Sequence, residues 1–221
     1  MAKSYILMKA ADENPLQRIC NPEFTSLMGH FDSPEIHYGP HVVYGIWQDF
    51  RLAYCNAAWF AFAAENRGEP HISCHWSLGR SIFDAIPHDL KGFYRKKFQD
   101  CLASGQHWTH DYECSSDEFY RKYHQTVYPL QKRGLIVVNA LMVETASHPF
   151  EEPADYAGPE AYLDENGFVH QCCHCRRVNN QQKTEQWDWV SWFVANPNPL
   201  TTHGICPHCL NHYYPEAKKY L

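Results

Sequence analysis

Hydrophobic and polar positions along the middle of the chain predict five strands. The first two are rich in β-branched and aromatic residues and are joined by a turn at 48–51, so they predict a hairpin. In the fourth, every second residue from Tyr120 to Tyr128 is expected on one face, and the fifth is a mostly apolar run. The five predicted strands are residues 41–47, 52–55, 108–114, 119–130 and 134–145.

Three helical elements are predicted between the second and third strands, the middle one a short apolar turn at 82–87. Residues 57–65 are rich in alanine and aromatic residues, and Asn56 precedes them as a suitable N-cap. From residue 88 to residue 104, apolar residues recur mostly at intervals of three and four, which predicts an amphipathic helix that Gly105 closes. The other face of this helix is basic and is most simply solvated, with docking of an acidic partner as the alternative; its residues are Lys91, Arg95, Lys96 and Lys97.

Proline-rich segments separate this central domain, residues 41–146, from both ends of the chain. Residues 1–40 contain Pro15, Pro22, Pro34 and Pro40, which predict short helices and loops that cap the next domain. Residues 147–161 combine further prolines with acidic residues and predict a stiff linker. Residues 162–221 are then expected to form a separate C-terminal module.

Composition and charge exclude several classes of partner. The chain has 221 residues, 44% of them hydrophobic and 20% charged, which suits a globular core. The net charge is −6, which argues against general adhesion to nucleic acid or anionic membrane. No apolar run approaches the roughly 20 residues of a membrane helix, and residues 5–8 are too short a patch for a signal peptide. A cytoplasmic location with reduced thiols is therefore expected.

Two cysteine pairs near the C-terminus carry the most specific chemistry. They are Cys172-x-x-Cys175 and Cys206-x-x-Cys209, with thirty residues between them. Each pair can bring two sulfur atoms to one ion, and two pairs complete a tetrahedral site with no position for water, so one structural zinc ion is expected. Four free buried cysteines are the alternative. Other potential ligands stand nearby: Cys173, His174, His203, His208 and His212.

The sequence around these pairs suits a negatively charged centre. Arg176 and Arg177 follow the first pair and can offset the charge of four thiolates. A helix starting near Leu210 would point its N–H groups at the sulfurs. A hairpin is expected between the two cysteine pairs. Together with the helix after the second pair, it predicts a treble-clef-like or ribbon-like module. Its small core is expected to contain Trp187, Trp189, Trp192 and Phe193.

The element order over residues 41–146 resembles a bacterial PAS domain. The resemblance rests on VYGI at 43–46, YCNAAW at 54–59, GRSIFDAIP at 79–87 and HDYEC at 110–114. It implies an α+β fold with a five-stranded antiparallel sheet and helices on one face. The pocket between them would hold a small molecule or be filled by side chains. The resemblance also implies sensing or homodimer formation rather than catalysis, although a fold alone assigns no ligand.

The C-terminal module resembles the cysteine-rich tail found beside PAS, response-regulator and histidine-kinase modules in bacteria. The matching segments are VHQCCHCRRV at 169–178, WDWV at 187–190, THGICPHC at 202–209 and YYP at 213–215. This resemblance brings no assigned reaction.

Two alternatives concern the sensory chemistry. A haem sensor needs an axial ligand, usually histidine, and His71, His75 and His88 fall in the helical region where such ligands sit. A thiol-based redox sensor would release its metal on oxidation. A flavin photosensor is disfavoured because Cys74 lies in ISCHW rather than in the reactive-cysteine motif of such proteins.

An enzyme is the least favoured interpretation. Cys114 lies near His110, but on a strand these residues share a face with Tyr112 between them, too far apart for a hydrogen bond.

The C-terminal module is not expected to bind nucleic acid. Residues 161–221 carry five basic and five acidic residues, which does not suit a reader of nucleic acid. The sequence therefore predicts a cytoplasmic sensory or adaptor protein that passes a signal to a partner protein.

Overall fold

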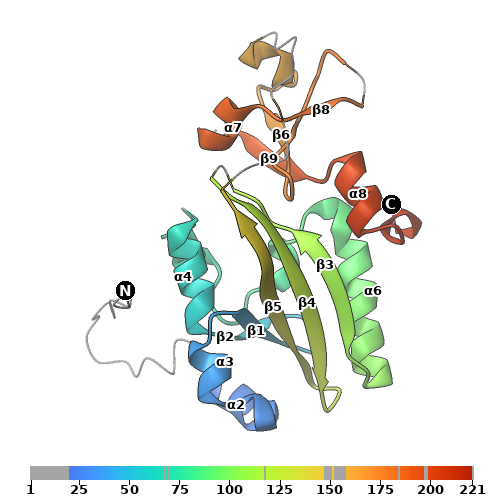
Figure 1. Ribbon diagram of the computed structural model, residues 1–221. Coiled ribbons are helices and arrows are strands. Elements are labelled where there is room, and N and C mark those ends of the chain that lie inside the picture. The colour runs from blue at the N-terminus through green and yellow to red at the C-terminus, as the bar shows by residue number, and fades with distance from the viewer. Residues whose placement is uncertain are drawn as a thin grey trace.

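The centre of the molecule is a five-stranded antiparallel sheet (Figure 1). The computed structural model describes residues 20–66, 68, 70–116, 118–146, 151, 158–183, 185–196 and 199–220. The sheet has the order β2-β1-β5-β4-β3, so the last strand lies between β1 and β4. The strands are β1 (Val42–Trp47), β2 (Leu52–Cys55), β3 (Trp108–Glu113), β4 (Tyr120–Leu130) and β5 (Gly134–Thr145). All five predicted strands are confirmed, and their bounds differ from the prediction by at most one residue.

Helices α4 (Ala57–Glu65) and α6 (His88–Ser104) pack against one face of the sheet, here called the inner face. Both helices were predicted with these bounds. Asn56 caps α4 by accepting a hydrogen bond from the backbone N–H of Trp59 (3.1 Å), and Gly105 ends α6 in the left-handed conformation, with φ of 71°. The short helices α5 (His71–His75) and η2 (Ile82–Asp84) lie between them in the chain.

Alternate residues of the central strands supply the two faces of the sheet. Tyr44, Leu135 and Val137 join the core under α6, whereas Val43 and Ile136 join a second core on the outer face. Side chains of a strand point to its two faces in turn, so a strand that is covered on both faces contributes alternate residues to two cores.

The N-terminal helices cover part of the outer face, so helices lie on both faces and not on one as predicted. These elements are α2 (Pro22–Met28), η1 (Gly29–Phe31) and α3 (Pro34–Tyr38). Phe24, Leu27 and Met28 bury their side chains against this face. A Cβ atom at Gly45 would lie 2.3 Å from the ring of Phe24, so only glycine allows this approach.

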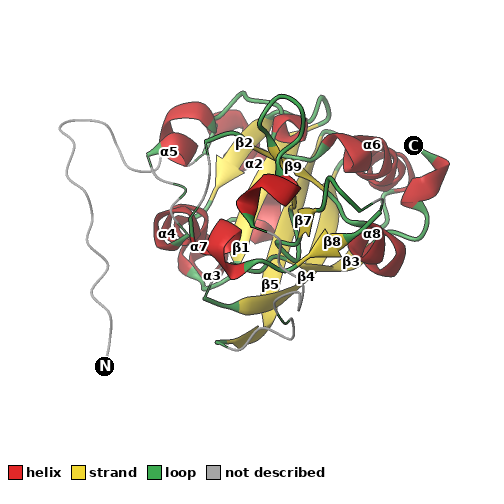
Figure 2. Cartoon of the chain, turned by 90° about the horizontal axis from the view of Figure 1, so that it is seen from above, coloured by secondary structure: helices red, strands yellow, loops and turns green. Residues whose placement is uncertain are grey.

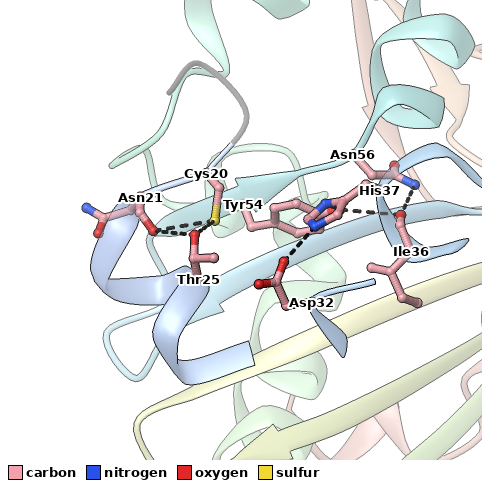
Figure 3. Close-up of polar contacts among 8 residues, drawn as sticks. All are labelled: Cys20, Asn21, Thr25, Asp32, Ile36, His37, Tyr54 and Asn56. Carbon is pink, nitrogen blue, oxygen red and sulfur yellow. Dashed lines mark hydrogen bonds and ion pairs between the residues drawn. The ribbon is translucent and has the colours of Figure 1, made fainter. Parts of the chain in front are cut away.

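A polar cluster ties α3 to the sheet (Figure 3). Tyr54 on β2 is fully buried, and its hydroxyl lies 3.0 Å from Nδ1 of His37. Nε2 of His37 lies 2.7 Å from the carboxylate of Asp32. The side-chain amide of Asn56 donates to the carbonyl oxygen of Ile36 (3.0 Å). These bonds hold the N-terminal segment against the sheet, as expected of a cap.

The C-terminal module has a small mixed sheet of order β8-β7-β6-β9 above the central sheet (Figures 1 and 2). Strand β9 runs parallel to β6, while β7 pairs with β6 and β8 in antiparallel fashion. The predicted hairpin between the cysteine pairs therefore corresponds to β7 and β8. The elements are η3 (Pro159–Tyr162), β6 (Val169–Cys172), β7 (Val178–Asn179), β8 (Trp187–Asp188), α7 (Ser191–Ala195), β9 (Thr201–Gly204), α8 (Pro207–Tyr213) and η4 (Ala217–Lys219).

The small core of the module differs from the predicted aromatic cluster. Phe193 is buried there with Tyr162, but Trp192 is 50% exposed, so its predicted core position is wrong. The one-turn helix α7 explains the difference, since adjacent residues point in different directions and Phe193 occupies the inner side. The remaining core residues are Ala161, Val169, Val178 and Val190.

Some predictions fall on undescribed parts of the chain. Residues 1–19 of the N-terminal cap lie outside the described residues, as does most of the predicted linker at 147–161. In the described part of the chain, no helix combines the length and the apolar character needed to cross a membrane.

Candidate metal centre

Four cysteine sulfur atoms meet inside the C-terminal module. The Sγ atoms of Cys172, Cys175, Cys206 and Cys209 lie within 4.8 Å of one another, and all four residues are buried. Those of Cys175 and Cys206 are 3.7 Å apart. Tetrahedral zinc with Zn–S bonds of about 2.3 Å places its sulfurs about 3.8 Å apart, whereas a disulfide has a length of about 2.05 Å. The geometry therefore fits a tetrahedral metal site.

The first cysteine pair lies at the end of a strand and in the turn that follows. Strand β6 ends at Cys172, whose N–H donates to the carbonyl oxygen of Arg177 (2.7 Å). The N–H of Arg176 donates to the carbonyl oxygen of Cys172 (3.2 Å) and closes the turn around Cys175. Arg176 has φ of 63°, a conformation that costs a non-glycine residue about 1–3 kcal/mol. Its Nε donates to the carbonyl oxygen of Ser115 (2.8 Å), which fixes the turn against the central sheet.

The second pair lies at the start of helix α8. Cys206 is the N-cap, and its sulfur accepts a hydrogen bond from the N–H of Cys209 (3.4 Å). Pro207 occupies the first helical position, where its missing N–H costs nothing. The helix thus begins at Pro207 and not near Leu210 as predicted, because the cysteine itself supplies the cap. Both sulfurs of this pair therefore lie at the helix N-terminus.

Hydrogen-bond donors around the sulfurs favour negative charge. The N–H of Cys206 points at the sulfur of Cys172 (3.4 Å), and Nη1 of Arg177 lies 3.8 Å from the sulfur of Cys175. The predicted contribution of Arg177 is thus supported by a contact. Arg176 instead directs its side chain to the central sheet, as described above. Donors of this kind orient thiolate ligands and stabilise their charge.

The sulfur atoms shift one another's pKa in opposite directions. Hydrogen bonds from Cys173 and from the other three cysteines of the cluster lower the pKa of Cys172. The hydrogen bond to Cys172 raises the pKa of Cys209 well above the usual thiol value. A divalent cation must displace the remaining protons to bind, so its affinity falls as the pH falls.

The other potential ligands lie outside the cluster. Among the described residues, the cluster contains the four cysteines and no histidine. His174 is buried, but its Nε2 lies 2.7 Å from the hydroxyl of Tyr214. The rings of His208 and His212 stack on each other at 6.3 Å on the exposed side of α8. These histidines are therefore engaged elsewhere.

The residues considered for haem or catalysis are not gathered at one site. His71 and His75 are exposed and stack on each other at 4.4 Å, and His88 has a 97% exposed side chain. His110 stacks on Trp108 at 5.5 Å. The N–H of Cys114 donates to the carbonyl oxygen of Arg121 beyond the end of β3, and burial raises the pKa of its thiol. The side chain of Cys74 lies outside the described atoms.

Sequence reasoning missed a polar row across the inner face. His110 on β3 is directly opposite Gln125 on β4, which is opposite Asn139 on β5. Oδ1 of Asn139 accepts hydrogen bonds from Nε2 of Gln125 (2.9 Å) and from the hydroxyl of Tyr112 (3.0 Å). Oε1 of Gln125 and Nε2 of His110 are buried, and neither has a partner in the part of the chain that the structure describes. Strand register could have revealed the row, but only once the pairing of β3, β4 and β5 was known.

The candidate metal centre shares one hydrophobic core with the central sheet. All four cysteines belong to the same cluster of buried residues as Phe93, Phe98 and Leu135. The centre is therefore continuous, through buried side chains, with the core between α6 and the inner face. A comparison of the chain with protein-family models and with curated proteins finds no match.

Proposed function

We propose that this protein is a PAS-type sensory or adaptor protein whose C-terminal module is held together by one structural zinc ion. The convergence of four buried cysteine sulfurs carries the zinc assignment. Zinc prefers closed tetrahedral sites with sulfur ligands when its role is structural. All four positions are protein sulfurs, so no position remains for a reacting water molecule.

The module depends on such a cross-link because its own secondary structure is sparse. Two of its strands have two residues each, and its longest helix has seven. Units of this size seldom bury enough apolar surface to fold alone, and a metal supplies the missing free energy. The residues present therefore fit a structural ion better than a catalytic one.

Native mass spectrometry of the full chain tests the zinc assignment. The expected result is a mass increase that corresponds to one zinc ion per chain, lost when Cys209→Ser removes one sulfur. Cys173→Ser is the matched control, because Cys173 lies outside the four-sulfur cluster. A wild-type chain that holds no zinc would contradict the assignment.

The sensory role is supported by the five-stranded antiparallel sheet with α4 and α6 on its inner face, which agrees with the PAS resemblance. The polar row of His110, Gln125 and Asn139 favours a small polar ligand on this face. Buried polar atoms without partners are costly, about 1–3 kcal/mol each, and a ligand with a donor for Oε1 of Gln125 would relieve that cost.

A thermal-shift screen with small polar metabolites tests the ligand proposal. A ligand that binds the row is expected to raise the Tm of the wild-type chain but not that of Gln125→Leu, which removes the amide. Native mass spectra of the same samples would show whether the ligand is retained. A screen in which every stabilising compound acts equally on both proteins would contradict the inner-face site.

A further inference from the structure

We infer that the metal centre and the inner face of the sheet are coupled through Tyr214, so that the state of the inner face sets how tightly the module holds its metal. This inference rests on the structural zinc of the proposed function. It assigns a regulatory contact to a segment, residues 214–220, which we call the strap. The strap follows α8 directly and ends the described part of the chain.

The contact begins inside the first cysteine pair. His174 stands between Cys172 and Cys175 and is 7% exposed. Its imidazole stacks on the ring of Tyr214 with centroids 5.4 Å apart and an interplanar angle of 7°. Nε2 of His174 also lies 2.7 Å from the hydroxyl of Tyr214. A shift of the metal-binding turn must therefore move Tyr214 or break this stack.

Tyr214 carries the contact to the inner face. It is fully buried, and its hydroxyl lies 3.0 Å from the hydroxyl of Tyr94 on α6. Its ring centroid lies 4.7 Å from that of His110 and 5.3 Å from that of Phe93. His110 is the first member of the polar row on the inner face. One side chain thus touches both the metal-binding turn and the proposed ligand site.

The rest of the strap is seated on α6 with little free space. Ala217 is fully buried in the same core. A Cβ atom at Gly92 of α6 would lie 2.9 Å from Cβ of Tyr220, closer than two such atoms approach. Nζ of Lys97 pairs with the carboxylate of Glu216 (2.8 Å). Because packed interiors resist gradual deformation, the strap is expected to be either docked or released.

Coupling of this kind is reciprocal. If docking of the strap strengthens metal binding, then metal binding strengthens docking by the same factor. A change at the inner face that disturbs Tyr94 or Tyr214 must therefore weaken the hold on zinc, although neither residue lies in the four-sulfur cluster. An effect of these residues on zinc binding would distinguish energetic coupling of the two sites from mere adjacency.

The test measures the rate at which the zinc-loaded full chain releases zinc to an excess of a chromophoric chelator. Tyr94→Phe removes only the hydroxyl on α6 and should speed release about fivefold, the effect expected for one buried hydrogen bond. Gly92→Ala should also speed release, because the added methyl group displaces Tyr220. Neither change adds or removes a sulfur ligand.

Tyr54→Phe is the matched control. It also removes the hydroxyl of a buried tyrosine, one that hydrogen-bonds His37 and Ile36 on the outer face, away from the module. It should lower the Tm while leaving the release rate within about twofold of wild type. Equal release rates for wild type, Tyr94→Phe and Gly92→Ala, or equal acceleration by Tyr54→Phe, would overturn the coupling alone. A wild-type chain that binds no zinc would overturn the structural-zinc proposal and this inference with it.

Discussion

The central sheet and the C-terminal module are stabilised by different means. The sheet has strands of up to 12 residues and a 17-residue helix, with buried apolar residues on both faces. The module has strands of two to four residues and a core of six buried residues, beside the four-cysteine cluster. The first region can rely on apolar burial, whereas the second needs a cross-link between remote segments.

This difference explains why the two regions meet where they do. The first cysteine-bearing turn is hydrogen-bonded to Ser115 beyond the end of β3, and the four cysteines belong to the same cluster of buried residues as the core under α6. Under the proposed function, a metal ion at this border would both fold the module and position Tyr214 on the inner face. The predictions below test how far the two regions remain distinct.

Removal of the metal is expected to have the largest effect. Structural zinc contributes about 10–16 kcal/mol in small zinc domains, so the module should unfold when a strong chelator removes the ion. Hydrogen–deuterium exchange should rise to unprotected rates in β6 to β9, while the middle of β4 and β5 stays protected. Protection of β6 to β9 in the metal-free chain would show that the module does not depend on the ion.

Truncation of a core side chain should weaken the sheet by a smaller but still large amount. Phe98 is fully buried under the sheet, and Phe98→Ala is expected to lower the free energy of unfolding by about 3–5 kcal/mol in urea titrations. The matched change Phe193→Ala lies in the small core of the module. In the zinc-loaded protein it should affect exchange in the module more than the unfolding of the sheet. Equal losses of global stability would mean that one cooperative unit spans both regions.

Asn56 offers a test of the polar contacts within the sheet region. Its Oδ1 accepts hydrogen bonds from the N–H groups of Val43 (3.0 Å) and Trp59 (3.1 Å). Asn56→Ala removes the acceptor of the Val43 N–H, while the N–H of Trp59 keeps only its contact with the carbonyl oxygen of residue 56 (3.2 Å). The change should lower the free energy of unfolding by about 2–3 kcal/mol. The control is Asn21→Ala, which removes a partly exposed N-cap of α2 and should cost about 1 kcal/mol. A smaller loss for Asn56 than for Asn21 would contradict the central role of this side chain.

Acid should weaken the molecule through His110. Burial, and next the nearby His174, lowers the pKa of His110 to about 4, against about 6.5 in an unfolded chain. The unfolded state takes up the proton first as the pH falls, so the stability from neutral His110 is present above pH 6.5 and is lost between about pH 6.5 and 4. At pH 5 the loss is about 2 kcal/mol.

The measurement compares urea unfolding of the wild type and of His110→Phe at pH 7.5 and pH 5. The variant should lose about 2 kcal/mol less than the wild type over this interval. Burial raises the pKa of Glu113, which acts in the opposite direction and is present in both proteins. Identical pH dependence in the two proteins would show that His110 is not the responsible group.

Strand and helix bounds of the central domain were predicted well because local signals agree with the fold. Asn56 and Gly105 mark the start of one helix and the end of the other, and alternation marks the strands. The N-terminal helices on the outer face were not placed, because their apolar residues show burial but not which face receives them. Strand β9 was missed because its partner β6 lies 32 residues earlier and no local pattern records a parallel pairing.

The candidate metal centre shows the same limit. Spacing alone predicted that the two cysteine pairs converge, and the four sulfurs do lie together. The spacing of the cysteines could not predict the position of His174, because a histidine between two cysteines can serve either as a metal ligand or as a packing contact. Only the tertiary structure shows that its ring faces Tyr214.

The smallest effect is expected for the ion pair that bridges the two regions. Lys97 forms a hydrogen-bonded ion pair with Glu216, which lowers the pKa of Glu216, but the carboxylate is exposed to solvent. Lys97→Met should shift the Tm by less than about 1 °C, because exposed pairs contribute little and are screened by salt. It should also leave the zinc release rate unchanged, in contrast to Tyr94→Phe. A larger effect of Lys97→Met than of Tyr94→Phe, reduced at high salt, would show that charge rather than buried aromatic packing joins the module to the sheet.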